Sequence, residues 1–336
     1  MSKPVIDMNN KPTAQIEKQA QAAADKLAKA KLAIGEVVYG QDKVVDLALA
    51  ALLSGGHTLL VGVPGLAKTL LVETLGTVMG LDNKRVQFTP DLMPADIIGS
   101  EVLEETAKGK RSFRFIAGPV FTQLLMADEI NRASPRTQSA LLQAMQERFV
   151  TVAGARHDLP APFHVLATQN PIEQEGTYPL PEAQLDRFLL QINVEFPDLE
   201  TEKTILLATT GSSQASAKKV ITPKQLMDMQ KLVRNLPIGE SVVSAILNLT
   251  RNARPDQSEY DFIKAHVSWG PGPRAGQALM LASRAKALIE GRLSPSIDDV
   301  AELAGPVLRH RMAISFAARA EGQSVDSIIS QLKAKL

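Results

Sequence analysis

The sequence predicts an α/β fold, in which a mostly parallel β-sheet with helices on both faces is followed by an all-helical second domain. Short apolar runs alternate with helical patterns up to "EFPD" at residues 195–198, after which Ala- and Leu-rich helical segments take over. The 336 residues also exceed the roughly 250 at which a single core stops growing. We therefore expect a core over residues 36–200 and a helical domain over 215–336, with a boundary between Phe196 and Ser216.

Two helices are expected before the first strand. Apolar residues recur at helical spacing from Thr13 to Leu32, which predicts one helix within an N-terminal segment of residues 1–35. A second helix is predicted from Gln41 to Leu53, because two glycines follow it directly.

Five apolar runs are too short for helices and are predicted to be buried strands. They cover residues 57–62, 85–89, 123–128, 163–169 and 188–194. Since helical patterns lie between some of them, the strands are expected to form a mostly parallel sheet that is covered on both faces.

Two hairpins interrupt this alternation. The first spans residues 100–118 and turns at 108–110, and the second spans 149–160 and turns at 153–154. The first hairpin carries a basic cluster, for which a solvated tip and a contact surface for a threaded or docked partner are both open. The cluster consists of Lys108, Lys110, Arg111 and Arg114.

The composition excludes several kinds of site. The 37 basic and 36 acidic residues give a net charge of +1, so the whole chain has no field that would draw it onto nucleic acid or an anionic membrane. The lack of cysteine excludes disulfides and thiol catalysis, and five histidines leave little for a metal site. The start has no apolar signal segment, and glycine and proline break the uncharged run from Leu47 to Ala67. We expect a cytoplasmic protein without a membrane span.

The segment "GVPGLAKT" at residues 62–69 matches the phosphate-loop pattern G-x-x-x-x-G-K-[ST] except for Ala67. It lies between a predicted strand and a predicted helix, where backbone N–H groups and the helix dipole point at one spot. Lys68 is then expected to reach the terminal phosphates and Thr69 to bind Mg²⁺. Alanine is tolerable at position 67 if the backbone there is helical rather than left-handed, because a methyl group then costs little. The alternative is a turn that merely ends a strand.

A second motif follows about sixty residues later. The strand "LLMAD" ends in Asp128 and Glu129. Asp128 is expected to hold Mg²⁺ through water, and Glu129 to act as the general base for an attacking water.

Together with three further motifs, these segments resemble the MoxR family of AAA+ ATPases, a group of P-loop NTPases. The matching segments are residues 62–69, 128–129, "ATQNP" at 167–171, "EAQLDRF" at 182–188 and "GPGPRAGQAL" at 270–279. The two hairpins match insertions of the wider clade that includes magnesium chelatase and the replicative MCM helicases. Alanine at the sixth loop position is common in the family.

The resemblance implies a site for ATP and Mg²⁺ and assigns residues to it. Tyr39 and Gly40 match the segment that packs around adenine. The residues assigned to the phosphate loop are Gly62, Pro64, Gly65, Leu66, Ala67, Lys68, Thr69 and Leu70.

Two more side chains match residues that sense the nucleotide. Asn170 matches the first sensor, which orients the lytic water, and the alternative is a turn residue before Pro171. Arg274 matches the second sensor, carried on the helical lid and expected to touch the same nucleotide from within the chain. Its alternative is an ordinary arginine at a helix start.

Arg187 matches the arginine finger, which is inserted into the neighbouring subunit's site to stabilise charge in the transition state. The alternative is a surface salt bridge with Asp186 or Glu182. Arg132 and Arg136 are further candidates for contact with a neighbouring subunit.

The resemblance therefore implies a Mg²⁺-dependent ATPase that forms a homo-oligomeric ring, for which we expect a hexamer. By the same resemblance its work is chaperone-like: it remodels or activates partner proteins, often ones with a von Willebrand A domain, including metal insertion into enzymes. Two other functions stay open. One is a DNA-dependent motor, which the near-zero net charge disfavours. The other is a nucleotide-gated switch without turnover, which an intact Glu129 and Arg187 disfavour.

Overall fold

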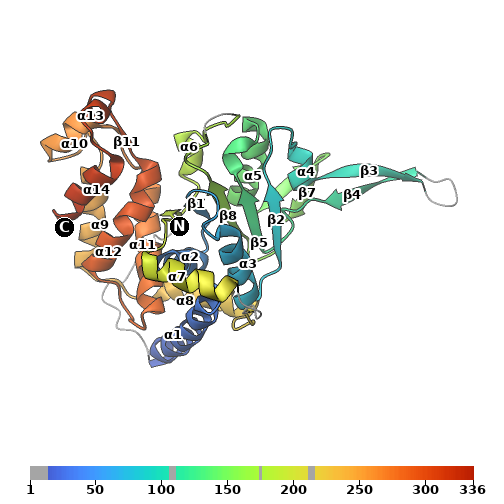
Figure 1. Ribbon diagram of the computed structural model, residues 1–336, viewed down its shortest axis with the longest axis horizontal. Helices are drawn as coiled ribbons and strands as arrows, with labels where there is room; N and C mark the ends of the chain where they lie inside the picture. The colour runs from blue at the N-terminus through green and yellow to red at the C-terminus, as the bar shows by residue number, and fades with distance from the viewer. Residues whose placement is uncertain (1–13, 106–110, 174–175, 211–215) are drawn as a thin grey trace, which may run out of the picture.

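The computed structural model describes residues 14–105, 111–173, 176–210 and 216–336 (Figure 1). Its centre is a sheet of strand order β2-β5-β8-β1-β9, in which every neighbouring pair is parallel, as predicted. The strands are β1 (Thr58–Val61), β2 (Asn83–Gln87), β5 (Leu124–Asp128), β8 (His164–Gln169) and β9 (Leu190–Asn193).

The sheet is buried on both faces, because successive strand residues enter two different clusters. Leu60 and Met126 pack with helices α1–α3 and the helical lid, whereas Leu59 and Leu125 pack with α5 and the short α4. The helices of this part are α1 (Ala14–Gly35), α2 (Asp42–Ser54), α3 (Lys68–Val78), α4 (Pro94–Ile98), η1 (Ile130–Arg132), α5 (Pro135–Glu147) and α6 (Glu182–Leu185).

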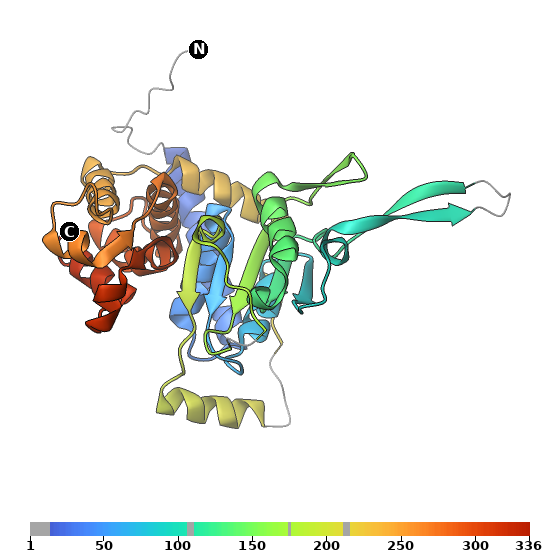
Figure 2. The same cartoon turned by 90° about the horizontal axis from the view of Figure 1, so that it is seen from above.

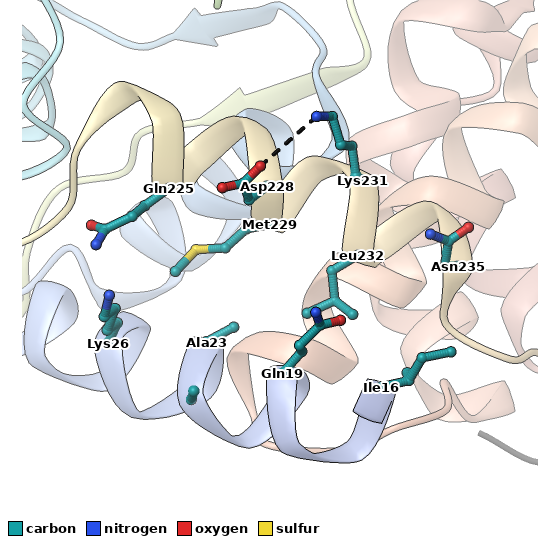
Figure 3. A pocket seen from close by; sticks show the side chains of 11 residues that line it. Ile16, Gln19, Ala23, Lys26, Gln225, Asp228, Met229, Lys231, Leu232 and Asn235 are labelled. Carbon is teal, nitrogen blue, oxygen red and sulfur yellow. Dashed lines mark ion pairs between the residues drawn. The ribbon is translucent and has the colours of Figure 1, made fainter. Parts of the chain in front are cut away.

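The N-terminal helix packs within its own chain. Ala20, Leu27 and Ile34 on α1 join the cluster that contains α2, α3 and the lid. A groove of about 410 Å³ remains between α1 and α8 (Pro223–Asn235), and Figure 3 shows its side chains. No helix of the described residues is long and apolar enough to cross a membrane.

Both predicted hairpins are present. The first, β3 (Gly99–Glu105) with β4 (Arg111–Ala117), projects far from the body (Figures 1 and 2), and its predicted turn lies outside the described residues. The second is β6 (Phe149–Val152) with β7 (Ala155–Asp158). Arg111 pairs with Glu105 at 3.2 Å and Arg114 pairs with Glu104 at 2.8 Å. These pairs neutralise the described half of the basic cluster, which favours the solvated-ribbon interpretation.

The lid is helical, with one small addition that the sequence analysis missed. Val267–Trp269 (β10) pairs with Ala313–Ile314 (β11), two segments too short to show a strand pattern. The other lid elements are α9 (Glu240–Asn252), α10 (Asp261–His266), α11 (Pro273–Ile289), α12 (Ile297–Leu308), η2 (Arg309–Arg311), α13 (Phe316–Ala320) and α14 (Val325–Lys333).

One helix, α7 (Leu199–Thr209), connects β9 toward the lid and has no buried residue. Asp198 caps it by accepting a hydrogen bond from the Thr201 N–H at 2.8 Å. In Figure 2 this helix lies apart from the body, beyond the edge at which β9 ends.

Candidate functional site

The segment at residues 62–67 forms a tight loop between β1 and α3. A Cβ on Gly62 would lie 2.7 Å from the carbonyl oxygen of Val194, so only glycine permits this approach of the chain after β9. Gly65 has a φ of +86°, which also favours glycine. The loop therefore opens directly onto the N-terminus of α3, where backbone N–H groups can bind an anion.

Ala67 does not meet the condition under which alanine costs little at this position. Its φ of 54° and ψ of 23° are left-handed, not right-handed. A Cβ in this region costs roughly 1–2 kcal/mol. The loop imposes the conformation because the chain must turn from β1 into α3 within six residues, and the sequence alone did not reveal that the methyl group is held at a cost.

The side chain of Lys68 folds back over the loop. Its Nζ donates hydrogen bonds to the carbonyl oxygens of Gly62 at 2.6 Å and Val63 at 2.7 Å. Burial lowers the pKa of Lys68, and the nearby carboxylates of Asp128 and Glu129 oppose that shift. The ammonium group thus lies between the phosphate loop and the acidic end of β5.

Asp128 is buried at the end of β5, and both of its carboxylate oxygens are engaged. Oδ2 accepts hydrogen bonds from Arg85 Nη2 at 2.6 Å and Nε at 3.1 Å. Oδ1 accepts one from Thr168 Oγ1 at 2.5 Å. Two neighbouring strands, β2 and β8, thereby fix the orientation of this carboxylate.

Glu129 follows in a left-handed conformation, with a φ of 55°. Its backbone N–H donates to Thr168 Oγ1 at 2.8 Å. Its Oε2 accepts hydrogen bonds from Gln87 Nε2 at 2.7 Å and Arg132 Nη1 at 3.0 Å. Arg132, predicted as a candidate for contact with a neighbour, is thus engaged within its own chain.

Asn170 follows β8 and makes the contacts of a turn residue. Its Oδ1 accepts a hydrogen bond from the Ile172 N–H at 3.1 Å, and its Nδ2 donates to Glu173 Oε2 at 3.5 Å. Asn170 therefore makes the contacts of the local turn and also lies at the carboxyl end of the central strand.

The strand order brings these groups to one edge of the sheet. The phosphate loop follows β1, Asn170 follows β8, and Asp128 with Glu129 ends β5, and these three strands are neighbours. The described residues contain no cluster of three or more His, Cys, Asp or Glu side chains that could hold a metal by themselves. A hydroxyl from Thr69 and a carboxylate from Asp128 instead fit Mg²⁺, which takes few protein ligands and completes its shell with phosphate and water.

A cavity of about 630 Å³ lies beside this edge, between core and lid. Gly40 lines it with Asn193 at the end of β9, Phe196 from the chain after β9, and Arg309 from the lid. Gly40 has a φ of +68°, and a Cβ there would overlap the Thr201 side chain on α7. The Tyr39 hydroxyl donates a hydrogen bond to the carbonyl oxygen of Glu36, the residue after α1, at 3.1 Å.

The two predicted arginines lie at the opposite edge of the sheet. Arg187 and Arg274 line a cavity of about 260 Å³ together with Gly56 and His57, which directly precede β1. Arg274 lies 3.7 Å from Asp186, whereas Arg187 has no carboxylate partner within the described part of the chain. The salt-bridge alternative for Arg187 is therefore wrong.

The position of Arg274 also corrects a prediction. The four residues of β1, a length of about 13 Å, separate the edge with Arg274 from the edge with the phosphate loop. Arg274 therefore cannot touch the nucleotide of its own chain in this arrangement. Its motif predicted an arginine at a helix start, but the side of the sheet depends on how α11 packs against α2.

A buried arginine that the sequence analysis missed holds this edge together. Arg311 is 2% exposed and donates to Asp186 Oδ1 at 2.7 Å and to the Phe188 carbonyl oxygen at 2.6 Å. The neighbouring His310 also donates to the Phe188 carbonyl oxygen, at 3.1 Å. These lid side chains thus hold Asp186 and Phe188, the residues on either side of Arg187.

Three further residues were missed at the carboxyl edge: Arg85, Gln87 and Thr168. The polar alternation in "RVQ" and the threonine in "ATQNP" were the available signals. These signals assign the three residues to the site only once β2 and β8 are known to flank β5.

Comparisons with known proteins agree with this geometry. The model of the ATPase family associated with various cellular activities (AAA) matches residues 57–190, and that of the AAA lid domain matches 262–332. The chain is 42% identical to Chaperone MoxR1 of Mycobacterium tuberculosis, over 91% of this chain and 80% of that protein. It is 30% identical to Protein MoxR of Paracoccus denitrificans, over 85% and 88%. A crystal structure described as a candidate ATPase from Cytophaga hutchinsonii matches with a TM-score of 0.88 and 37% identity, over 96% of this chain and 97% of that one.

Proposed function

The chain belongs to the MoxR family of AAA+ ATPases, and from this premise we propose that it hydrolyses ATP with Mg²⁺ in a head-to-tail ring and thereby remodels partner proteins. The observation that carries the proposal is the convergence of the phosphate loop, Asn170 and the pair Asp128–Glu129 at the ends of three neighbouring strands.

In this proposal each group at the carboxyl edge has one task. The loop N–H groups and Lys68 bind the phosphates, while Thr69 and Asp128 hold the magnesium ion, which neutralises charge on the phosphates when bound. Asn170 orients a water molecule and Glu129 takes its proton. The water oxygen bonds to the γ-phosphorus, and the bond to the β–γ bridging oxygen breaks, which releases ADP and phosphate.

The arginine edge supports the ring. Arg187 and Arg274 lie too far from their own phosphate loop to act there, and they line one cavity, where Arg274 lies 3.7 Å from Asp186, the neighbour of Arg187 in the chain. We propose that a subunit presents both side chains to the γ-phosphate bound by its neighbour. The second sensor would then act between subunits rather than within one.

The finer points of the proposal rest on family membership. The relative named Chaperone MoxR1 supports protein remodelling, and we propose partners that include proteins with a von Willebrand A domain, a hexameric ring and a cytoplasmic location. A net charge of +1 disfavours nucleic acid as the substrate.

The test is the ATPase rate against protein concentration, followed by a mixing experiment. Arg187→Ala and Lys68→Ala are each expected to be inactive alone. A mixture should regain part of the rate, because a Lys68→Ala subunit offers an intact Arg187 to an intact phosphate loop. The control mixes Arg187→Ala with the double variant Lys68→Ala/Arg187→Ala, which has nothing to offer. A rate per subunit that is independent of concentration, with no recovery on mixing, would favour a monomeric nucleotide switch.

A further inference from the structure

Helix α7 presents an apolar face that no other part of the described chain covers. Three leucines on it are largely exposed: Leu199 at 77%, Leu206 at 63% and Leu207 at 72%. Phe196, just before the helix, is 71% exposed. Thr201, on the inner side, faces Gly40 and the cavity beside the phosphate loop. The cap at Asp198 and the position of Thr201 beside Gly40 therefore fix the start of the helix, whereas its outer face remains accessible to a partner.

The start of this helix is acidic. The segment "EFPDLETE" at residues 195–202 contains four carboxylates and no basic residue. Asp198 is used for the cap, so Glu195, Glu200 and Glu202 remain as charges around the apolar face. Glu200 and Glu202 lie in the first turn of α7, where negative charge also suits the helix dipole.

A groove of matching character lies on the lid. It runs between α9 and α11, has a volume of about 800 Å³, and its apolar lining includes Val243, Leu247 and Met280. Leu247 is 54% exposed. Three arginines border the groove: Arg234, Arg251 and Arg254.

The charges at this groove have few partners of their own. Within the described residues neither Arg234 nor Arg251 forms an ion pair, and Arg254 donates to the Pro271 carbonyl oxygen and to Gln257. Opposite charge on an approaching helix would therefore meet unpaired guanidinium groups. Such complementarity sets the orientation of an interface and excludes wrong partners.

The groove is also continuous with the arginine edge. Gln277 and Leu281 line both the groove and the cavity that contains Arg187 and Arg274. A neighbour that brings its Arg187 to a phosphate loop must bring this groove to the same side of the molecule. That side carries α7, since Thr201 borders the cavity beside the loop.

We propose that α7 of one subunit seats in the groove between α9 and α11 of the next copy of this chain. Leu206 and Leu207 enter the apolar lining, and the acidic first turn meets the bordering arginines. The contact is heterologous, because the helix and the groove are different surfaces of one subunit, so repetition generates a ring or a spiral. This inference rests on the head-to-tail assembly proposed above.

The chain contains no cysteine, so engineered cysteines report the contact without background. Leu206→Cys and Leu247→Cys are made separately in the full chain, mixed with ATP and Mg²⁺, and oxidised. We expect a cross-link between the two variants, and, in the double variant, a ladder of bands that ends at the subunit number of a closed ring. The control pairs Leu206→Cys with Phe316→Cys, which is equally available at 88% exposure but lies on α13. That pair should yield at most a tenth of the product.

A second variant tests the same contact without a disulfide. Leu206→Lys/Leu207→Lys would bury positive charge in the apolar lining of an already basic groove and should raise the protein concentration for half-maximal ATPase rate at least tenfold. If mixing restores activity between Arg187→Ala and Lys68→Ala but neither the cross-link nor the tenfold shift is seen, the ring stands and this contact is wrong. Preferential linkage of Leu206→Cys to itself would replace it with a symmetric contact. If no assembly forms at all, the proposed function fails first.

Discussion

The two edges of the central sheet differ in how their functional residues are brought together. At the carboxyl edge, each group directly follows its own strand, so the loop at 62–69 and the pair Asp128–Glu129 need only the strand order to meet. At the amino edge, Arg187 is placed by lid residues more than a hundred positions away, through Arg311. Chemistry that is local in sequence thus lies at one edge, and coupling between distant segments lies at the other. We expect changes at the two edges to fail in different ways.

Glu129→Gln tests the carboxyl edge and should have the largest effect. Loss of the general base is expected to lower the turnover number about 100- to 10,000-fold while ATP still binds. Steady-state ATPase rates and equilibrium ATP binding measure the two effects. The amide keeps the size of the side chain and can still accept from Gln87 and Arg132. A variant that hydrolyses ATP at the normal rate would eliminate the proposed mechanism.

Arg311→Met tests whether the amino edge depends on the lid. The change removes the guanidinium group that donates hydrogen bonds to Asp186. Loss of this buried partner should reduce the free energy of unfolding by about 3–5 kcal/mol. Urea unfolding measures it. Arg114→Met is the control, because Arg114 pairs with Glu104 on the exposed first hairpin, where such pairs contribute at most about 1 kcal/mol.

Activity provides a second measure of Arg311. If the residue positions Arg187, then at a temperature where the variant is folded it should bind ATP normally, and mixing with Lys68→Ala should restore part of its rate. A purely structural role would weaken ATP binding as well, and mixing would restore nothing.

Acidification should lower the free energy of unfolding through two buried histidines at the amino edge. Burial lowers the pKa of His57 to about 3 and that of His164 to about 4, so both are neutral when folded. Unfolded histidines take up protons below pH 6.5, so stability is complete above that pH and falls as the pH drops toward 4. Each histidine should cost about 2 kcal/mol between pH 7 and pH 5.

The geometry explains why these rings resist protonation. His57 Nδ1 accepts from the Val165 N–H at 3.0 Å, and a proton there would abolish the bond. Urea unfolding at pH 5, 6 and 7 measures the slope, which His57→Asn should reduce. Equal stability at pH 5 and pH 7 would contradict the assignment of neutral buried histidines.

Arg274→Ala distinguishes a contribution between subunits from one within a subunit. We expect a 10- to 100-fold loss of turnover, since one of several charged groups at the phosphate is removed. Mixing with Lys68→Ala should restore part of the rate if the arginine acts on the neighbour. If Arg274 acted within its own chain, each subunit in that mixture would lack one essential group, and the rate would stay low.

The sequence predicted the sheet, both hairpins and the carboxyl edge because strands, turns and the residues directly after strands leave local patterns. It could not predict the partners of Asp128, since Arg85 and Thr168 reach it only through the lateral order of β2, β5 and β8. The side on which Arg274 lies depends on the packing of a helix about two hundred residues from the phosphate loop. No local pattern in the phosphate loop or in the helix that carries Arg274 shows at which edge of the sheet this arginine lies. Backbone strain at Ala67 was equally hidden, because the loop imposes the left-handed conformation and an alanine in the sequence does not signal it.

Ala67→Gly should have the smallest effect and tests that strain directly. Glycine removes the roughly 1–2 kcal/mol cost of a left-handed Cβ but adds about 0.5–1 kcal/mol of backbone entropy in the unfolded chain. The net gain in the free energy of unfolding should therefore lie between about 0 and 1.5 kcal/mol, with ATP affinity unchanged. Ala153→Gly is the control: it has a φ of 48° in the turn of the second hairpin, away from the site. If Ala153→Gly gains stability and Ala67→Gly loses it, the left-handed conformation at position 67 is not the ground state of the loop. In that case the methyl group of Ala67 itself favours the conformation that the loop adopts.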